Sequence, residues 1–269
     1  MEMPEATKDP ALAFEVPDAP QPGTHVLVIG IETYPYLAGG TSHVAGRFKG
    51  MGQLPSATRS AREVADWFLE HFTNEDKPLA SVALVLSEPE PATYSHGCLP
   101  SAVTGLPRGS VEEVVAALQD WAKRAASHPD NLAVLYFCGH GVSFAAGQLL
   151  LCRDFATGPD TDYQASINLA NLTAALATRP PGEQLILVDC CREPQDVAQS
   201  IVTKVGLGRS PIDPKTGLER SSTRLSAHTS TSEMSRAFGR RTGLTFFAEA
   251  LIKALNGGGV QSDMGEWVG

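Results

Sequence analysis

Two short stretches of the sequence carry residues whose types suit nucleophilic catalysis. His140 stands between two glycines directly after an apolar run, and Asp189 is followed by two adjacent cysteines, Cys190 and Cys191. A cysteine becomes an effective nucleophile as a thiolate, so it needs a nearby base or positive group, and a histidine can supply this. If the two stretches end neighbouring strands, an imidazole and a thiol face each other.

Each stretch taken alone also has an ordinary structural explanation. A Gly-His-Gly run is typical of a glycine turn that happens to contain a histidine, and cysteine is commonly buried as a small apolar residue. Gly139 and Gly141 would, however, leave room for a substrate backbone and allow the sharp turn that presents the imidazole of His140. The joint occurrence of the two stretches at two strand ends favours the catalytic interpretation.

Both stretches follow segments that have the pattern of buried parallel strands. Residues 132–137 and 185–188 are short continuous apolar runs, as in strands covered on both faces, and polar groups begin where such strands leave the sheet. That edge is where open α/β sheets bind ligands. Further strands are expected at residues 25–31, 81–86, 148–152 and 225–229, and helices at residues 56–72, 111–122, 169–178 and 244–255. Ser56 or Ser60 is expected to cap the first helix, and Ser110 with Glu113 forms a capping box for the second.

The alternation of strands and helices predicts an α/β fold with a mainly parallel sheet and helices on both faces. Residues 1–23 hold five prolines and few large apolar groups, which predicts a flexible leader. Residues 24–256 are expected to form one domain, within which residues 192–224, rich in glycine, proline and basic residues, form an exposed loop open to proteolysis. Residues 257–269 form a tail without a finishing element, as expected of a chain truncated from a longer protein.

The amino-acid composition limits the partners, the cellular location and the cofactors that are expected for this chain. The formal net charge of -9 and the absence of a basic run argue against a nucleic-acid-binding surface. No apolar stretch is long enough to span a membrane and no signal peptide is recognisable, so a cytoplasmic protein is expected. The five cysteines predict free thiols in a reducing compartment. No dinucleotide or phosphate-binding glycine motif follows the first strand, and the acids Asp154, Asp160, Asp162 and Asp196 form no defensible calcium pattern, so neither cofactor nor metal is expected.

The two stretches resemble the histidine and cysteine motifs of the caspase and metacaspase superfamily. Residues 136–141 are Tyr-Phe-Cys-Gly-His-Gly and residues 189–192 are Asp-Cys-Cys-Arg. In caspases the histidine lies about 50 residues before the cysteine, and here Cys191 follows His140 by 51 positions. The resemblance implies a caspase-like three-layer α/β/α sandwich with a mainly parallel central sheet. It also implies a cysteine endopeptidase that cleaves protein substrates.

The resemblance implies roles for individual residues. Alignment on the Cys-Arg pair makes Cys191 the nucleophile, His140 its base and Cys190 a small residue at the strand end. Backbone N–H groups of the cysteine and of the glycine after the histidine form the family's oxyanion hole, which implies Cys191 and Gly141. Asp189 matches the metacaspase acid that binds the basic side chain of the substrate residue before the cut, called P1.

The chain also departs from the family pattern. Ser60 replaces a second metacaspase acid, with Arg59 and Arg62 close by, and caspases use arginines to bind an aspartate at P1. The expectation of a basic P1 residue therefore depends on Asp189 alone. The alternative role of this acid is to accept hydrogen bonds that hold a loop. The glycine expected after Cys-Arg is replaced by a Glu-Pro pair, residues 193–194.

The resemblance implies a bacterial protease of regulated proteolysis, cell death or defence. Its expected partners are a protein substrate and an activating sensor domain or subunit. Relatives are often cut during activation, and residues 192–224 are the expected position of such a cut. The alternative is a degenerate caspase-fold scaffold that binds partners without proteolysis.

Overall fold

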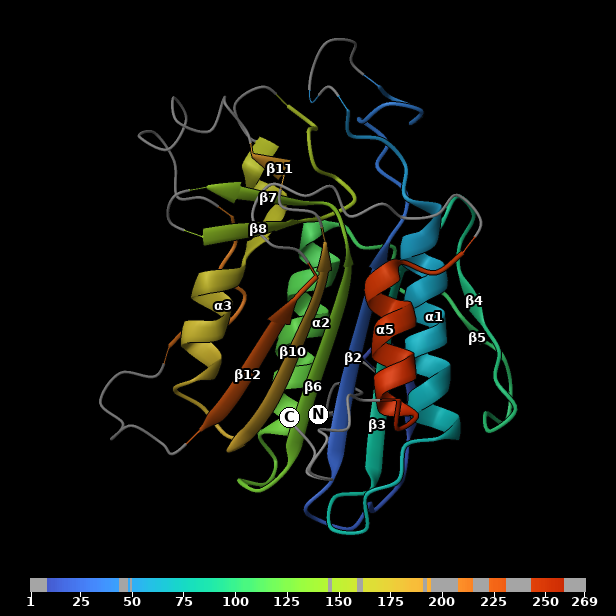
Figure 1. Ribbon diagram of the computed structural model, residues 1–269, viewed down its shortest axis with the longest axis vertical. Helices are drawn as coiled ribbons and strands as arrows, with labels where there is room; N and C mark the ends of the chain where they lie inside the picture. The colour runs from blue at the N-terminus through green and yellow to red at the C-terminus, as the bar shows by residue number, and fades with distance from the viewer. Residues whose placement is uncertain are drawn as a thin grey trace, which may run out of the picture.

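The centre of the protein is a six-stranded sheet with the strand order β1-β3-β2-β6-β10-β12 (Figure 1). The computed structural model describes residues 9–43, 48, 50–144, 147–158, 162–190, 193–194, 208–214, 223–230 and 243–258. The strands of this sheet are β1 Leu12–Glu15, β2 Thr24–Ile31, β3 Leu79–Ser87, β6 Leu132–Gly139, β10 Glu183–Cys190 and β12 Arg224–Thr229. β1 runs antiparallel to β3, and the other neighbouring strands pair in parallel. The expected mainly parallel sheet is therefore confirmed.

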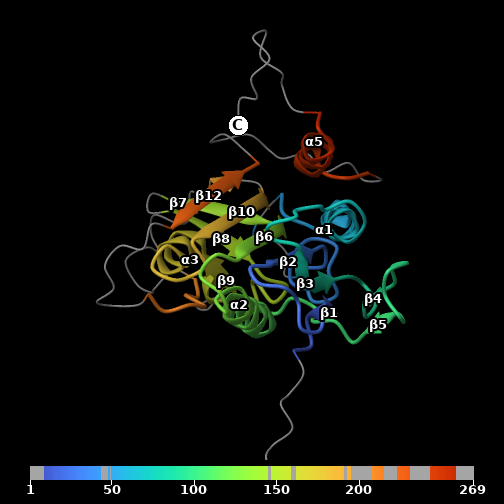
Figure 2. The same ribbon diagram turned by 90° about the horizontal axis from the view of Figure 1, so that it is seen from below.

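Helices cover both faces of the sheet (Figure 2). The helices are α1 Pro55–Glu70, α2 Val111–Ala125, α3 Leu169–Leu176 and α5 Phe246–Leu255. α1 and α5 lie on one face, and α2 and α3 lie on the other. Successive strand residues point to opposite faces, so Val28 belongs to the core under α1 and Ile29 to the core under α2. This arrangement confirms the three-layer α/β/α sandwich.

The two long helices begin in different ways. Ser110 and Glu113 form the expected capping box at the start of α2, where the Glu113 side chain accepts the Ser110 N–H at 2.9 Å. The expectation that Ser56 or Ser60 caps α1 is wrong, because the helix begins at Pro55 and no side chain caps it. Proline suits this first position since its φ is already helical and its missing N–H would have no partner there.

Residues 9–15 are packed against the domain, unlike the flexible leader that composition predicts. Leu12 to Glu15 form β1 on the edge of β3, with Phe14 opposite Val82. Ala11 is fully buried, and Asp9 forms an ion pair with Arg124 of α2. A short alternation of apolar residues is enough to extend an existing sheet edge, although it is too short to identify a strand in a proline-rich sequence.

Part of the expected exposed loop over residues 192–224 is packed against the domain. In residues 208–214, Ile212 is only 4% exposed and belongs to the core under α2 and α3. The backbone N–H of Arg209 donates to the carbonyl oxygen of Ser166 at 2.7 Å, which ties the segment to strand β9, Ser166–Asn168. The expectation of a wholly exposed loop is wrong for this part, and most of the remainder lies outside the described residues.

A smaller sheet, with the order β11-β7-β8-β9, lies beyond the C-terminal ends of the central strands (Figure 1). Its strands are β7 Gly141–Phe144, β8 Gly147–Leu151, β9 Ser166–Asn168 and β11 Glu193–Pro194. The strand expected at residues 148–152 is thus confirmed as β8. The unexpected Glu-Pro pair forms β11, an edge strand parallel to β7, where a proline is tolerated. A separate antiparallel pair, β4 Thr93–Tyr94 and β5 Val103–Thr104, lies between β3 and α2.

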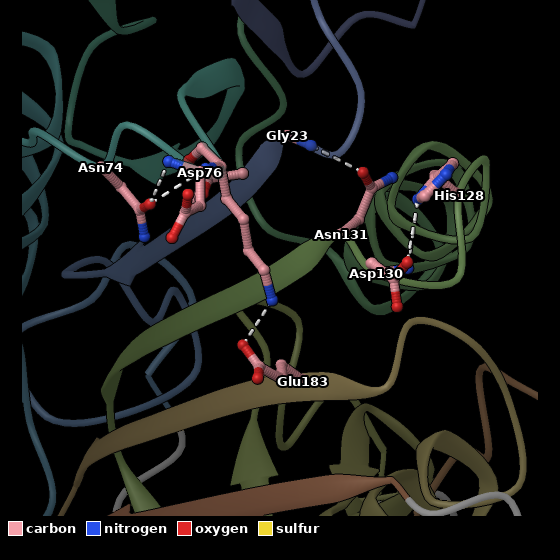
Figure 3. A network of polar contacts seen from close by, with 9 residues as sticks. Gly23, Asn74, Asp76, His128, Asp130, Asn131 and Glu183 are labelled. Carbon is pink, nitrogen blue, oxygen red and sulfur yellow. Dashed lines mark hydrogen bonds and ion pairs between the residues drawn. The ribbon is translucent and has the colours of Figure 1, made fainter.

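Polar contacts hold the opposite end of the central sheet, where its parallel strands begin (Figure 3). The Gly23 N–H donates to Asn131 Oδ1 at 2.7 Å, and Asn131 Nδ2 donates to the carbonyl oxygen of Ala125 at the end of α2 at 3.0 Å. Lys77 Nζ lies 2.5 Å from Glu183 Oε2 at the start of β10. These contacts fix the strand starts, while His140 lies at the other end of the sheet, directly after β6.

Candidate active site

The pairing of β6 with β10 brings the two chemical stretches together. The last paired positions are Cys138 opposite Asp189 and Gly139 opposite Cys190. The residue that follows Gly139 is His140, and the residue that follows Cys190 is Cys191. Cys191 lies outside the described residues. The register therefore places Gly139 and Cys190, the residues directly before His140 and Cys191, side by side at the C-terminal edge of the sheet.

The His140 imidazole is buried and has a defined tautomer. Its Nε2 lies 2.8 Å from the carbonyl oxygen of Gly52, and the residue is 5% exposed. A carbonyl oxygen can only accept, so Nε2 carries the proton and Nδ1 of the neutral ring keeps a free lone pair. Nδ1 is buried and has no hydrogen-bond partner among the described residues. The ring is therefore oriented with an unoccupied proton acceptor, which is what a general base requires.

Tyr34 holds both the backbone and the ring of His140. The His140 N–H donates to the Tyr34 hydroxyl oxygen at 2.8 Å, and the hydroxyl lies 3.4 Å from the carbonyl oxygen of Leu151. The Tyr34 and His140 ring centroids are 4.8 Å apart. A Cβ on Gly139 would lie 2.9 Å from the same hydroxyl, so this close approach requires glycine.

Burial is the main influence on the protonation of His140. It lowers the pKa of His140 to about 4, and the hydrogen bond to Gly52 opposes this in part. Transfer of the ring out of water disfavours the charged form, and no acid is among the causes of the shift. The imidazole is therefore neutral at pH 7, in the form that can accept a proton.

We expect His140 to titrate near pH 4 rather than at its ordinary value of 6.5 in a Cys191→Ala protein. The substitution removes the neighbouring thiol, whose titration would be coupled to that of the ring. The titration can be followed by NMR on ¹⁵N-labelled histidine. A pKa of 6.5 or above would show that the ring is exposed to solvent, contrary to the structure.

The same shift has a consequence for stability. Between pH 6.5 and pH 4 the unfolded His140 binds more protons than the folded one, so the stability that it contributes falls as the pH falls through this window. Asp189 and Glu32 have raised pKa values, chiefly through burial, and act in the opposite direction. The contribution of His140 is isolated by comparing two proteins, Cys191→Ala and a second protein that carries both Cys191→Ala and His140→Gln. Both proteins retain Asp189 and Glu32, so the contribution of these acids is common to them. Chemical unfolding should therefore show that acidification from pH 6.5 to pH 4 costs the second protein less stability than the first.

The Gly141 amide is oriented away from its hairpin partner. Gly141 lies opposite Leu150, and the Leu151 N–H donates to the carbonyl oxygen of His140 at 3.0 Å. In an antiparallel ladder, alternate residues turn their N–H and C=O groups toward the partner strand. The Gly141 N–H consequently points away from β8, to the side of β7 where β11 pairs.

Asp189 is an internal hydrogen-bond acceptor in this structure. The residue is 3% exposed, and its Oδ2 accepts hydrogen bonds from the hydroxyls of Tyr136, at 2.9 Å, and of Thr245. The Cys138 sulfur lies 3.5 Å from the same oxygen. Burial raises the pKa of the Asp189 carboxyl, and the hydrogen bonds from Thr245 and Tyr136 oppose this change. Its proposed role in substrate binding stays a prediction.

Thr245 links this acid to two helices. Its hydroxyl accepts the Ala248 N–H at 3.1 Å and so caps α5, while its own N–H donates to Ser60 Oγ at 2.9 Å. Ser60 is fully buried in α1. Ser60, which the resemblance aligns with a second metacaspase acid, therefore helps to hold the start of α5 beside Asp189.

The remaining charged and sulfur groups near the expected site have defined neighbours. Arg62 forms a bidentate ion pair with Glu88, at 2.7 and 3.0 Å, whereas Arg59 is exposed. Cys190 is buried on the face of β10 opposite to Asp189, and its sulfur lies 2.9 Å from Gln148 Nε2. Within the described part of the chain, no group of three His, Cys, Asp or Glu side chains is arranged to hold a metal ion.

The fold and this strand edge define a caspase-like α/β protein. The sequence matches the caspase domain family over residues 24–267, so the chain belongs to that family and the family assignment expected from the sequence is confirmed. It is also 25% identical to an uncharacterized protein, y4kE, of Sinorhizobium fredii (strain NBRC 101917 / NGR234) over 209 residues. That match covers 72% of this chain and 58% of the length of y4kE. No helix in the described ranges is long and apolar enough to cross a membrane.

Some residues around His140 carried no signal in the sequence. Gly52 contributes a backbone carbonyl, which any residue could supply, and it lies in a glycine-rich loop far from the motif. Gln53 and Thr245 have ordinary polar side chains with no characteristic spacing to His140 or Asp189. Tyr34 follows the strand expected at residues 25–31, and this place after a strand end is the signal that points to it.

Proposed function

We propose that this chain is a cysteine endopeptidase in which Cys191 is the nucleophile and His140 its general base. The observation that carries the proposal is the buried imidazole whose Nε2–H is bound to Gly52, while Nδ1 has no partner in the part of the chain that the structure describes. Membership of the caspase domain family and the register of β6 with β10 support the choice of the cysteine segment.

The proposed reaction proceeds through an acyl-enzyme. His140 Nδ1 takes the thiol proton of Cys191, and the thiolate attacks the carbonyl carbon of the peptide bond. The N–H groups of Gly141 and Cys191 stabilise the oxyanion, which the orientation of the Gly141 amide away from β8 supports. The imidazolium protonates the leaving amine. Water, deprotonated by His140, then releases the new carboxylic acid and restores the thiol.

We further propose that Asp189 binds a basic side chain at P1. Its carboxylate lies at the strand end, one residue before Cys190, and the incoming cation would replace the Thr245 hydroxyl on Oδ2. The bidentate pairing of Arg62 with Glu88 leaves that arginine committed elsewhere, which weakens the case for an acidic P1 residue. By family resemblance, we also propose that the peptidase acts in regulated proteolysis, in cell death or defence. An activating sensor domain or subunit would control it.

A panel of fluorogenic peptides with Arg, Lys or Asp at P1 tests this specificity, with Cys191→Ala as the inactive control. We expect Arg and Lys peptides to be cleaved and Asp peptides to be spared. Asp189→Asn should cost about 1.5 to 3 kcal/mol of transition-state binding, roughly a 10- to 150-fold loss in kcat/KM for the basic peptides. Asp130→Asn, at an exposed site near the opposite end of the sheet, should change nothing. Faster cleavage of the Asp peptide than of the Arg peptide would contradict the assignment.

A further inference from the structure

The side chain of Gln53 connects the two chain segments that hold His140. It lies between Gly52 and the start of α1. Its Oε1 accepts the Tyr34 N–H at 2.8 Å, and its Nε2 donates to the carbonyl oxygens of Tyr34, at 3.0 Å, and of Ala38, at 3.1 Å. Both amide protons and one acceptor site of this side chain are therefore used within a single loop.

These hydrogen bonds connect Tyr34 to the segment of Gly52, and these two residues contact the His140 imidazole. Tyr34 contacts the His140 ring and accepts its backbone N–H, whereas the Gly52 carbonyl accepts the Nε2 proton. Gln53 is covalently attached to Gly52 and hydrogen-bonded to Tyr34 at both backbone groups. The bridge between Ala38 and Gly52 adds a second connection between the same two segments. The position of the Gly52 carbonyl relative to Tyr34 thus depends on Gln53.

The tautomer of His140 depends in turn on that carbonyl. If the carbonyl oxygen moves out of reach, Nε2 loses its acceptor and the form protonated at Nδ1 becomes competitive. A ring protonated at Nδ1 cannot take a proton there, and a displaced ring is misaligned with the thiol. Displacements of about 1 Å at a catalytic group can reduce rates by roughly 100-fold.

We propose that Gln53 is a positioning residue that fixes the tautomer and orientation of the His140 imidazole. Its effect on catalysis rests on the proposed peptidase function, whereas its effect on the ring does not. Two measurements separate these consequences: the tautomer of His140 in the Cys191→Ala protein, and the kinetic constants of the enzyme that retains Cys191.

The first measurement uses ¹⁵N-labelled histidine and NMR at pH 7. We expect His140 to carry its proton on Nε2 in the Cys191→Ala protein, and to show a mixture of tautomers when Gln53→Leu is added. Gln119→Leu is the matched control, because Gln119 is an exposed residue of α2 whose Nε2 donates to the carbonyl oxygen of Pro211. An unchanged His140 tautomer in a folded Gln53→Leu protein would overturn the inference.

The second measurement is the pH profile of peptide hydrolysis for Gln53→Glu, a variant that keeps the size of the side chain. The introduced carboxylate cannot donate to the carbonyl oxygens of Tyr34 and Ala38, so we expect kcat to fall about 10- to 100-fold with little change in KM. Protonation of the introduced carboxyl restores one donor, so activity relative to the natural enzyme should rise as the pH falls toward 5. A loss in KM alone, or a relative activity independent of pH, would contradict a positioning role.

The outcomes also separate this inference from the proposed function. If the natural protein hydrolyses no peptide and Gln53→Leu still shifts the tautomer, the peptidase proposal fails and the positioning role stands. If peptides are hydrolysed and neither Gln53 variant affects the ring or kcat, the peptidase proposal stands and the positioning role fails. If Gln53→Leu does not fold, the tautomer is measured in Gln53→Glu at pH 7 with the same expected result.

Discussion

Replacing His140 by alanine is expected to abolish peptide hydrolysis, with a fall in kcat/KM on the order of 10³-fold or more. The imidazole supplies the proton acceptor for the thiol and the donor for the leaving amine, and its Nδ1, which is bonded to no described residue, is the group that can do both. Cys191→Ala should be equally inactive, because a nucleophile and its base act as a unit and the effects of removing them do not add. Cleavage of the preferred fluorogenic peptide measures both losses.

Cys190→Ala is the matched control for this experiment. Cys190 is buried on the opposite face of β10 from Asp189, so its loss should leave most of the activity, and thermal unfolding should show that all three variants remain folded. If Cys190→Ala is the inactive variant, the nucleophile has been assigned to the wrong cysteine. Failure of iodoacetamide to alkylate Cys191 at neutral pH, together with no peptide cleavage, would favour a scaffold that binds partners.

Trp121→Ala is expected to cause the largest loss of stability, about 3 to 5 kcal/mol in the free energy of unfolding. Trp121 is fully buried in α2, in the core that this helix forms with the sheet. Its Nε1–H donates to the carbonyl oxygen of His25 in β2 at 3.0 Å. Alanine would leave a cavity between helix and sheet, and it would also leave that carbonyl without its partner.

Urea unfolding of Trp121→Ala and Trp121→Phe separates these two contributions. Phenylalanine keeps much of the apolar volume and removes the indole N–H, so it should cost about 1 to 3 kcal/mol, less than alanine. Trp67→Phe serves as the control on the other face of the sheet, where the indole of Trp67 is only partly buried and bonds to Asn256. A loss below about 1 kcal/mol for Trp121→Ala would mean that α2 is not anchored by this side chain.

The sequence predicts the core strands well because burial on both faces leaves a strong pattern. β6 and β10 appear as continuous apolar runs, and the chain returns to polar residues at their ends. β1 escapes prediction because its four residues are stabilised by an edge that β3 already provides. Ile212 escapes for a similar reason, since one apolar residue among glycines and prolines does not show that its segment packs against α2 and α3.

The candidate site is predictable where side-chain chemistry defines it and unpredictable where the backbone does. His140 and Asp189 stand at strand ends, so their positions followed from the strands. The Gly52 carbonyl that orients His140 comes from 88 residues away, and any residue type can supply a carbonyl oxygen. Thr245 reaches Asp189 across 56 residues because α5 packs beside α1, a tertiary contact that leaves no local pattern.

The order of the strands determines what a break in the backbone between Pro194 and Arg224 would do. β12 pairs with β10 at six positions, from Arg224 opposite Glu183 to Thr229 opposite Val188. Such a break leaves Asp189 on the N-terminal piece and Thr245 on the C-terminal piece, and the two residues are hydrogen-bonded. Hydrogen bonds and packing therefore join the two pieces at several places. A chain severed in this interval is a non-covalent complex of two fragments that share one sheet. Its integrity then depends on sheet pairing and core packing rather than on the continuity of the chain.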